Sequence, residues 1–189
     1  MKRICVYCGS SAGARPVYAD AACHLAEVLY EQGLELVYGG AAKGTMGVIA
    51  DRMLALGGKV HGVIPEFLRA KEIAHAELSE LHVVASMHER KSLMAELSDG
   101  FIALPGGFGT LEEIVEIVTW GQLRMHAKPC GLLNIDGYFD ALLQFLGHAE
   151  AEGFLRAVNR DMLLAESDAA ALLKRFRDYR APNVEKWLS

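Results

Sequence analysis

Short runs of apolar residues alternate with helical patterns along most of this chain of 189 residues. Each run is continuous, which is typical of strands buried on both faces of a parallel sheet covered by helices. The predicted strands are 3–8, 34–39, 59–64, 81–85, 100–105 and 129–134. The predicted helices are 16–32, 44–56, 87–98, 110–123, 138–151 and 168–178. The pattern predicts an α/β fold: a single doubly wound, Rossmann-like domain over residues 1–189, with a mainly parallel sheet flanked by helices.

Charge and hydropathy narrow the classes of partner. The chain has 19 Lys and Arg residues and 24 Asp and Glu residues, which gives a net charge of −5. A negative net charge argues against broad binding of nucleic acid. No apolar segment reaches the roughly 20 residues that span a membrane, and the start MKRICVYCGSS lacks a signal-peptide core. We therefore expect a cytoplasmic protein with no membrane partner.

Cys5 and Cys8 form a C-x-x-C pattern, which in other contexts indicates redox chemistry or a zinc site. Here the pattern falls inside a predicted strand, where residues three apart point to opposite faces. A structural zinc site would also need a second pair of ligands at suitable spacing. We therefore expect two buried, unreactive thiols and no metal at this position.

Three glycine-rich turns follow predicted strands, at 8–11, 38–47 and 104–110. Because ligands of such sheets bind at the carboxyl ends of the strands, the backbone amides of these turns are predicted to line one pocket for an anionic ligand. The less regular, charged stretch 65–78 is predicted to be a loop over that site.

Two common nucleotide motifs are nearly present, and neither is complete. The Walker A pattern G-x-x-x-x-G-K-[ST] fails because Lys43 precedes Gly44 instead of following it. The dinucleotide pattern G-x-G-x-x-G begins at Gly107 and Gly109 but has Glu112 in place of the third glycine. The misplaced lysine also argues against phosphotransfer.

The stretch PGGFGTLEE, residues 105–113, combines a phosphate-type loop with carboxylates. We expect Thr110 to be the N-cap of helix 110–123, whose free amides and dipole favour a phosphate monoester. Glu113 then has two interpretations. It can complete a T-x-x-E capping box with Thr110. Alternatively, at about one helical turn (5.4 Å) past the loop, it can stabilise the positive charge that develops on a sugar when a glycosidic bond breaks, or activate the attacking water.

The stretch MHERK, residues 87–91, places two cations, Arg90 and Lys91, next to each other in a predicted helix. The simpler interpretation is a solvated helix face. The alternative is that Arg90 points into the pocket and binds phosphate or ribose with its planar guanidinium. An arginine in that position would also favour the ionised form of a neighbouring Glu113.

Together these stretches resemble the Lonely Guy (LOG) family of phosphoribohydrolases, formerly described as possible lysine decarboxylases. PGGFGTLEE fits the family pattern P-G-G-x-G-T-x-x-E without a departure, and MHERK and VTWGQL (118–123) support the match. The resemblance extends from Cys5 to about Gly153. It implies hydrolysis of the N-glycosidic bond of adenosine 5′-monophosphates, with or without a substituent on N6. The products would be the free base, a cytokinin or adenine, and ribose 5-phosphate.

The resemblance also implies roles for individual residues. Arg90 and Glu113 are the implied catalytic pair, and neither a metal nor an organic cofactor is expected. Phe108 stands where many members have Tyr, a change that keeps the ring. The implied partners are a nucleoside monophosphate and a second copy of the chain, in a homodimer with sites near the interface. The implied substrate-binding residues are Glu72, Lys91, Gly106, Gly107, Phe108, Gly109, Thr110, Leu111, Glu112 and Thr119.

Two other functions stay open at this point. A non-catalytic nucleotide-binding protein of the same fold would use the same glycine-rich turns, but it has no need of a carboxylate at the sugar. A pyridoxal-dependent decarboxylase needs a Schiff-base lysine on a much larger scaffold, and this chain contains no His-Lys dipeptide. The sequence does not select among bases, because that choice depends on the shape of the pocket.

Overall fold

The computed structural model describes residues 1–72 and 74–182, and of residues 70–72 it describes the backbone alone. Its strands are β1 (Arg3–Tyr7), β2 (Glu35–Tyr38), β3 (Val60–Pro65), β4 (Glu80–Val84), β5 (Gly100–Ala103), β6 (Cys130–Leu133) and β7 (Leu163–Glu166). Its helices are α1 (Pro16–Glu31), α2 (Gly44–Ala55), α3 (Glu66–Glu72), α4 (Met87–Leu97), α5 (Phe108–Gln122), the 3-10 turn η1 (Ile135–Gly137), α6 (Asp140–Ala151), α7 (Ala157–Arg160) and α8 (Ala169–Asp178).

These strands form one parallel sheet in the order β4-β3-β2-β1-β5-β6-β7. The chain builds outward from β1 as far as β4 and then returns to β5 on the other side of β1. The connections that follow β1 and β5 therefore leave toward opposite faces, which opens a crevice at the carboxyl ends of these two strands. The predicted doubly wound α/β fold is confirmed.

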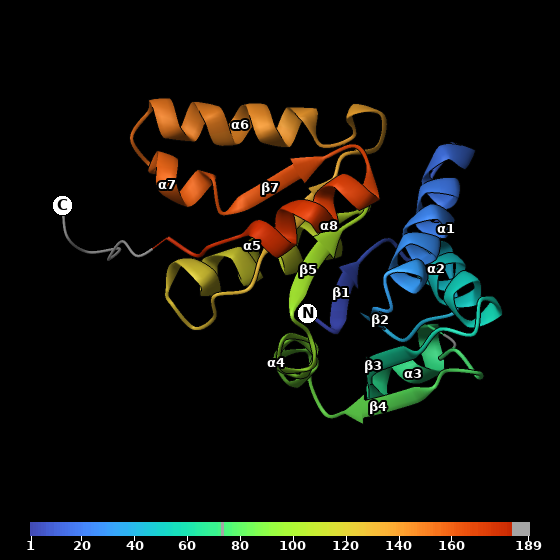
Figure 1. Ribbon diagram of the computed structural model, residues 1–189. Helices are drawn as coiled ribbons and strands as arrows, with labels where there is room; N and C mark the ends of the chain where they lie inside the picture. The colour runs from blue at the N-terminus through green and yellow to red at the C-terminus, as the bar shows by residue number, and fades with distance from the viewer. Residues whose placement is uncertain (73, 183–189) are drawn as a thin grey trace.

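Helices cover both faces of the sheet (Figure 1). On one face, α1, α2 and α8 bury apolar side chains that include Leu25, Ile49 and Phe176. On the other face, α4 and α5 do the same with Met94 and Ile114. No helix in the described part of the chain is both long and apolar enough to cross a membrane.

The two thiols of the C-x-x-C pattern lie where their spacing predicts. Cys8 belongs to the core beneath α1 and α2, and Cys5 belongs to the core on the opposite face. Both are buried free cysteines. Burial raises the pKa of each thiol well above its usual range, so both are unreactive at neutral pH.

Two predictions of local structure are wrong. The run 81–85 is not buried on both faces, because β4 is an edge strand with Leu81 and Val83 exposed. An apolar run does not by itself distinguish an edge strand from a central one. The stretch 65–78, predicted to be a loop, contains the short helix α3.

A third correction concerns the start of α5. The helix begins at Phe108, two residues earlier than predicted, and its N-cap is Gly107 with no side-chain hydrogen bond. Thr110 is a buried residue inside the first turn. The interpretation of Glu113 as part of a capping box with Thr110 is therefore wrong, since that motif requires the threonine to be the N-cap residue.

Candidate active site at the carboxyl ends of β1 and β5

A cavity of about 220 Å³ opens at the carboxyl ends of β1 and β5, at the point where the strand order reverses. Sheets of this type bind ligands at that point. The walls come from the turn after β1, the start of α2, the first half of α4 and the first turns of α5. The lining residues are Cys8, Gly9, Ser10, Met46, Arg90, Gly107, Phe108, Gly109, Thr110 and Glu113.

The start of α5 forms the anion-binding part of this cavity. The first amides of the helix, from Phe108 to Thr110, have no acceptor within the helix, and the helix dipole adds partial positive charge there. Gly106 allows the loop to close onto the helix, because a Cβ at this position would lie 2.1 Å from Thr110 Oγ1. Backbone amides and dipole together suit a phosphate monoester.

A buried ion pair joins α4 to α5 in the cavity wall. Arg90 Nη1 lies 3.1 Å from Glu113 Oε1, and each side chain is only 9% exposed. Arg90 Nε donates a second hydrogen bond to the carbonyl oxygen of Val63 at 3.1 Å. Arg90 is thus not part of a solvated helix face, and its guanidinium is fixed beside the carboxylate.

The turn 38–47 mainly supports the cavity, instead of lining it as predicted. Thr45 Oγ1 accepts a hydrogen bond from Gly9 N at 2.9 Å and donates one to Gly9 O at 3.1 Å. Gly44 has a φ of +61°, and a Cβ there would lie 2.3 Å from the backbone of Ser10. Lys43 is an exposed N-cap, and Met46 is the residue of this turn that lines the cavity. The incomplete Walker A motif thus holds the first turn in place.

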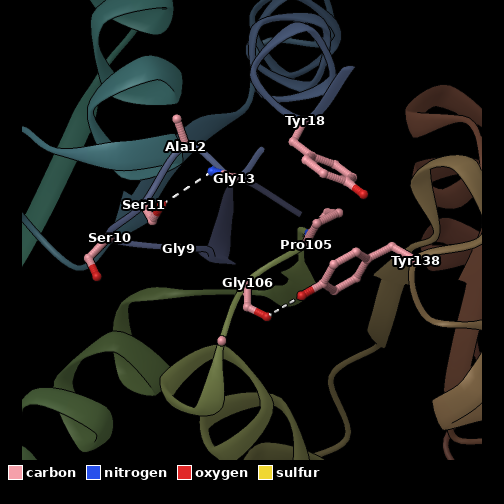
Figure 2. A pocket seen from close by; sticks show the side chains of 10 residues that line it. Gly9, Ser10, Ser11, Ala12, Gly13, Tyr18, Pro105, Gly106 and Tyr138 are labelled. Carbon is pink, nitrogen blue, oxygen red and sulfur yellow. Dashed lines mark hydrogen bonds between the residues drawn. The ribbon is translucent and has the colours of Figure 1, made fainter. Parts of the chain in front are cut away.

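A second hollow, of about 280 Å³, lies beside the cavity and shares Gly9, Ser10 and Gly107 with it. Tyr18 and Tyr138 lie next to each other on one side of this hollow (Figure 2), in an edge-to-face contact with ring centroids 5.5 Å apart. The Tyr138 hydroxyl donates a hydrogen bond to the carbonyl oxygen of Gly106 at 2.7 Å (Figure 2). Tyr138 therefore anchors the glycine loop, a role for which sequence reasoning had no signal.

The structure brings part of the predicted site together around the cavity. Two of the predicted residues line other hollows: Gly106 lines the second hollow, and Thr119 lines a separate groove between α5 and α6. Leu111 lies on α5 outside the cavity lining. The predicted residues that line the cavity are Arg90, Gly107, Phe108, Gly109, Thr110 and Glu113.

Lys91 and Glu112 contact each other outside the cavity. Lys91 Nζ lies 2.5 Å from Glu112 Oε1 and 2.9 Å from Glu116 Oε2. Burial opposes the charge of Lys91, but the hydrogen bonds that its ammonium group donates to these two carboxylates outweigh that effect and raise its pKa. Glu72 ends α3, and its side chain lies outside the described part of the structure.

The chemistry of the cavity walls is limited to a few groups. Burial and the negative charge of Glu113 raise the pKa of Cys8 to about 12, so this thiol is protonated at neutral pH and is no nucleophile. The described lining residues include one carboxylate and no histidine, which is too few ligands for a metal ion. They also include no lysine for a Schiff base. The basic and acidic side chains among the described lining residues are those of Arg90 and Glu113.

Comparison with known proteins gives sequence relatives over nearly the whole chain. The family model described as "Possible lysine decarboxylase" matches residues 46–176. A protein of Oryza sativa subsp. japonica named "Probable cytokinin riboside 5'-monophosphate phosphoribohydrolase LOGL1" is 49% identical over 183 residues, 97% of this chain and 82% of that protein. An Arabidopsis thaliana protein named "Cytokinin riboside 5'-monophosphate phosphoribohydrolase LOG1" is 48% identical over 185 residues, 98% of this chain and 86% of that protein.

Solved structures of similar fold include two proteins that handle the molybdenum cofactor. The molybdenum cofactor binding protein of Rippkaea orientalis has a TM-score of 0.69 and 21% identity, covering 94% of this chain and 97% of that one. The molybdenum cofactor carrier protein of Chlamydomonas reinhardtii has a TM-score of 0.68 and 20% identity, covering 94% and 98%. At this identity the likeness supports the fold alone, whereas the sequence relatives carry the family. The chain belongs to the Lonely Guy (LOG) family, in which the relatives are named cytokinin riboside 5′-monophosphate phosphoribohydrolases.

Proposed function

We propose that this protein hydrolyses the N-glycosidic bond of adenosine 5′-monophosphates, with or without a substituent on N6, and releases the base and ribose 5-phosphate. The observation that carries the proposal is the Arg90–Glu113 ion pair beside the first turn of α5. A phosphate site needs only the helix start. A buried carboxylate in the same cavity suits the sugar, where positive charge develops as the bond breaks.

The phosphate is the group that positions the substrate. In this proposal it lies at the first amides of α5, between Gly107 and Thr110, where the helix dipole favours negative charge. Glu113 lies about one turn further along the same helix, roughly 5 Å in rise. This spacing is comparable with the reach from a 5′-phosphate to the anomeric carbon of the same ribose.

Bond cleavage then uses water and the fixed ion pair. The bond from the anomeric carbon to the base nitrogen breaks, its electron pair leaves with the base, and the sugar gains oxocarbenium character. Water adds its oxygen to the anomeric carbon, one proton passes to the departing base, and ribose 5-phosphate forms. The Glu113 carboxylate stabilises the cationic sugar, and Arg90 holds that carboxylate in position and contacts the ribose or phosphate.

The proposal includes a homodimer whose second copy covers the mouth of the cavity. Phe108, at the rim, is 93% exposed, and Val115, two turns further along the same face of α5, is 51% exposed. Exposed apolar side chains in one region are typical of an interaction surface. Lys91, Leu111, Glu112 and Thr119 lie outside the cavity lining, and a partner subunit would bring such residues close to a substrate. The protein is proposed to act in the cytoplasm, without nucleic acid or membrane partners.

The proposed activity is tested by incubating the purified protein with AMP and with isopentenyl-AMP and measuring base release by chromatography. We expect both bases to be released, and the ratio of kcat/KM values gives the preference for an N6 substituent. Arg90→Met should lower kcat by about 100-fold or more, because a buried transition-state contact is lost. The matched control is Glu96→Gln, an exposed residue on the same helix, which should retain full activity.

The alternative, a non-catalytic nucleotide-binding protein, makes the opposite prediction. Such a protein would bind AMP with a measurable Kd and would release no base from either nucleotide.

Light scattering separately tests the dimer: Val115→Lys should shift the protein toward monomers and lower base release. A monomeric wild-type protein with full activity would contradict the dimeric part of the proposal.

A further inference from the structure

A group of side chains of the kinds that bind metals lies near the amino ends of β3 and β4, away from the cavity at the carboxyl ends of β1 and β5. The strands pair His61 with Glu80 and Val63 with His82, so that positions 61, 80 and 82 share one face of the sheet. One ligand atom from each of His61, Glu80 and His82 lies within 4.8 Å of the other two. His61 Nδ1 is 3.1 Å from Glu80 Oε2, and His82 Nε2 is 3.5 Å from Glu80 Oε1.

The ring of His61 is held in the orientation that a metal ligand needs. The His61 side chain is 7% exposed, and its Nε2 lies 2.9 Å from Glu35 Oε2. A proton on Nε2 that is donated to Glu35 leaves the lone pair of Nδ1 directed toward Glu80. Metal-binding histidines usually donate their second ring nitrogen to a carboxylate in this way, which fixes the tautomer. Glu35 is fixed in turn by Arg3, whose Nε donates to Glu35 Oε2 at 2.8 Å.

His82 supplies an independent observation that points to a metal ligand. Its Nε2 is shielded from solvent but has no hydrogen-bond partner, although the imidazole as a whole is 25% exposed. A buried nitrogen without a partner is unfavourable, because it has lost the hydrogen bonds that it makes to water in the unfolded chain. The contact with Glu80 Oε1, at 3.5 Å, is too long to satisfy it. A cation between these two atoms would satisfy both.

We propose that His61, Glu80 and His82 bind a divalent transition-metal ion of the zinc type. Two imidazole nitrogens and one carboxylate oxygen are a ligand set that zinc accepts, with water in a fourth position. Tetrahedral ligands about 2.0–2.2 Å from zinc are about 3.3 Å apart, and small side-chain rotations bring the three atoms to that spacing. The ion would tie the exposed edge strand β4 to β3. It has a structural role and takes no part in base release.

The test uses untagged protein stripped with EDTA and then titrated with Zn²⁺ in a calorimeter. We expect one Zn²⁺ per chain and a higher melting temperature in the presence of the metal. Co²⁺ at the same site should show the intense visible absorption of a tetrahedral complex. Base release from AMP should be the same with and without EDTA, so failure of this site and failure of the proposed reaction give different results.

Three variants make the assignment specific. His82→Ala removes a ligand on the partly exposed edge strand and should abolish the melting-temperature shift while the protein stays folded and active. Glu35→Gln removes the outer-shell carboxylate and should weaken Zn²⁺ binding by about 10- to 100-fold. His148→Ala, at an exposed position on α6, is the matched control and should bind Zn²⁺ like the wild type. Equal Zn²⁺ binding by the wild type and His82→Ala, or no stoichiometric binding by either, would overturn the proposal.

Discussion

Gly39 leaves the space that the Arg90 guanidinium occupies. A Cβ at position 39 would lie 2.2 Å from Arg90 Nη2, closer than any real contact. The backbone of Gly39 is not in the left-handed region, so the need for glycine comes from side-chain contacts: chiefly Arg90, and then Met46, whose Sδ would lie 3.0 Å from the added Cβ. A residue at the carboxyl end of β2 thus decides whether the ion pair between α4 and α5 can form.

This relationship predicts a variant that loses activity and keeps its fold. In Gly39→Ala the new methyl group pushes against the flexible end of Arg90, which can move, so the melting temperature should change little. The displaced guanidinium should lower kcat/KM for AMP by about 100-fold, since a shift of about 1 Å in an active site has effects of that size. Kinetics and thermal unfolding of the same sample check both parts. Wild-type kinetics in a stable variant would show that the position of Arg90 is unimportant.

The Tyr138 hydroxyl should position the glycine loop. Tyr138→Phe removes the hydrogen bond to Gly106 O, whose net contribution is about 1 kcal/mol. We expect the KM for AMP to rise about fivefold with a smaller change in kcat, because the loop holds the substrate and not the reacting bond. Tyr30→Phe, an exposed position on α1, is the control. A change in kcat alone would contradict a positioning role.

Gly44 should be essential for folding, both because its φ is positive and because a side chain there would clash with the Ser10 backbone. Gly57 shares only the positive φ, so a comparison of the two positions separates these effects. Gly44→Ala places a methyl group 2.3 Å from the Ser10 backbone at a φ of +61°, and it should destabilise the protein by more than about 3 kcal/mol. Gly57 has a φ of +84° with open space around it, so Gly57→Ala should cost only about 1 kcal/mol. Urea unfolding of both variants gives the comparison. Equal losses would mean that the contact with Ser10 is unimportant.

Cys8 gives a pH-dependent test of the environment around Glu113. Because the pKa of this thiol is raised to about 12, its thiolate fraction at pH 8 is only about one in ten thousand. Its alkylation by iodoacetamide, followed by mass spectrometry, should keep accelerating up to pH 10. Cys23, which is partly exposed, should react first. A rate that levels off near pH 8.5 would show that neither burial nor Glu113 affects this thiol.

The sequence predicted the fold well because continuous apolar runs and helical periodicity are local signals. They locate β1, β2, β3, β5 and β6 to within two residues at each end. They do not reveal that β4 is an edge strand, since its position depends on strand order and not on composition. They also miss the start of α5, because a glycine N-cap leaves no side-chain signal and Thr110 offers a misleading one.

The site was less predictable, for a similar reason. The motif stretches place Arg90 and Glu113 on two helices, but their contact depends on how α4 and α5 pack on the sheet. The supporting residues Gly39, Thr45 and Tyr138 act through distances that spacing along the chain does not encode. The histidine and glutamate ligands on β3 and β4 became visible only when the strand register placed them on one face.

The most direct measurement is base release from AMP by the wild type and by Glu113→Gln under single-turnover conditions. Glutamine keeps the shape of the side chain and removes its charge, so AMP should still bind. We expect the wild type to release adenine and the variant to be slower by about 100- to 10,000-fold. Equal rates in a folded Glu113→Gln variant, or no adenine from the wild type, would contradict it.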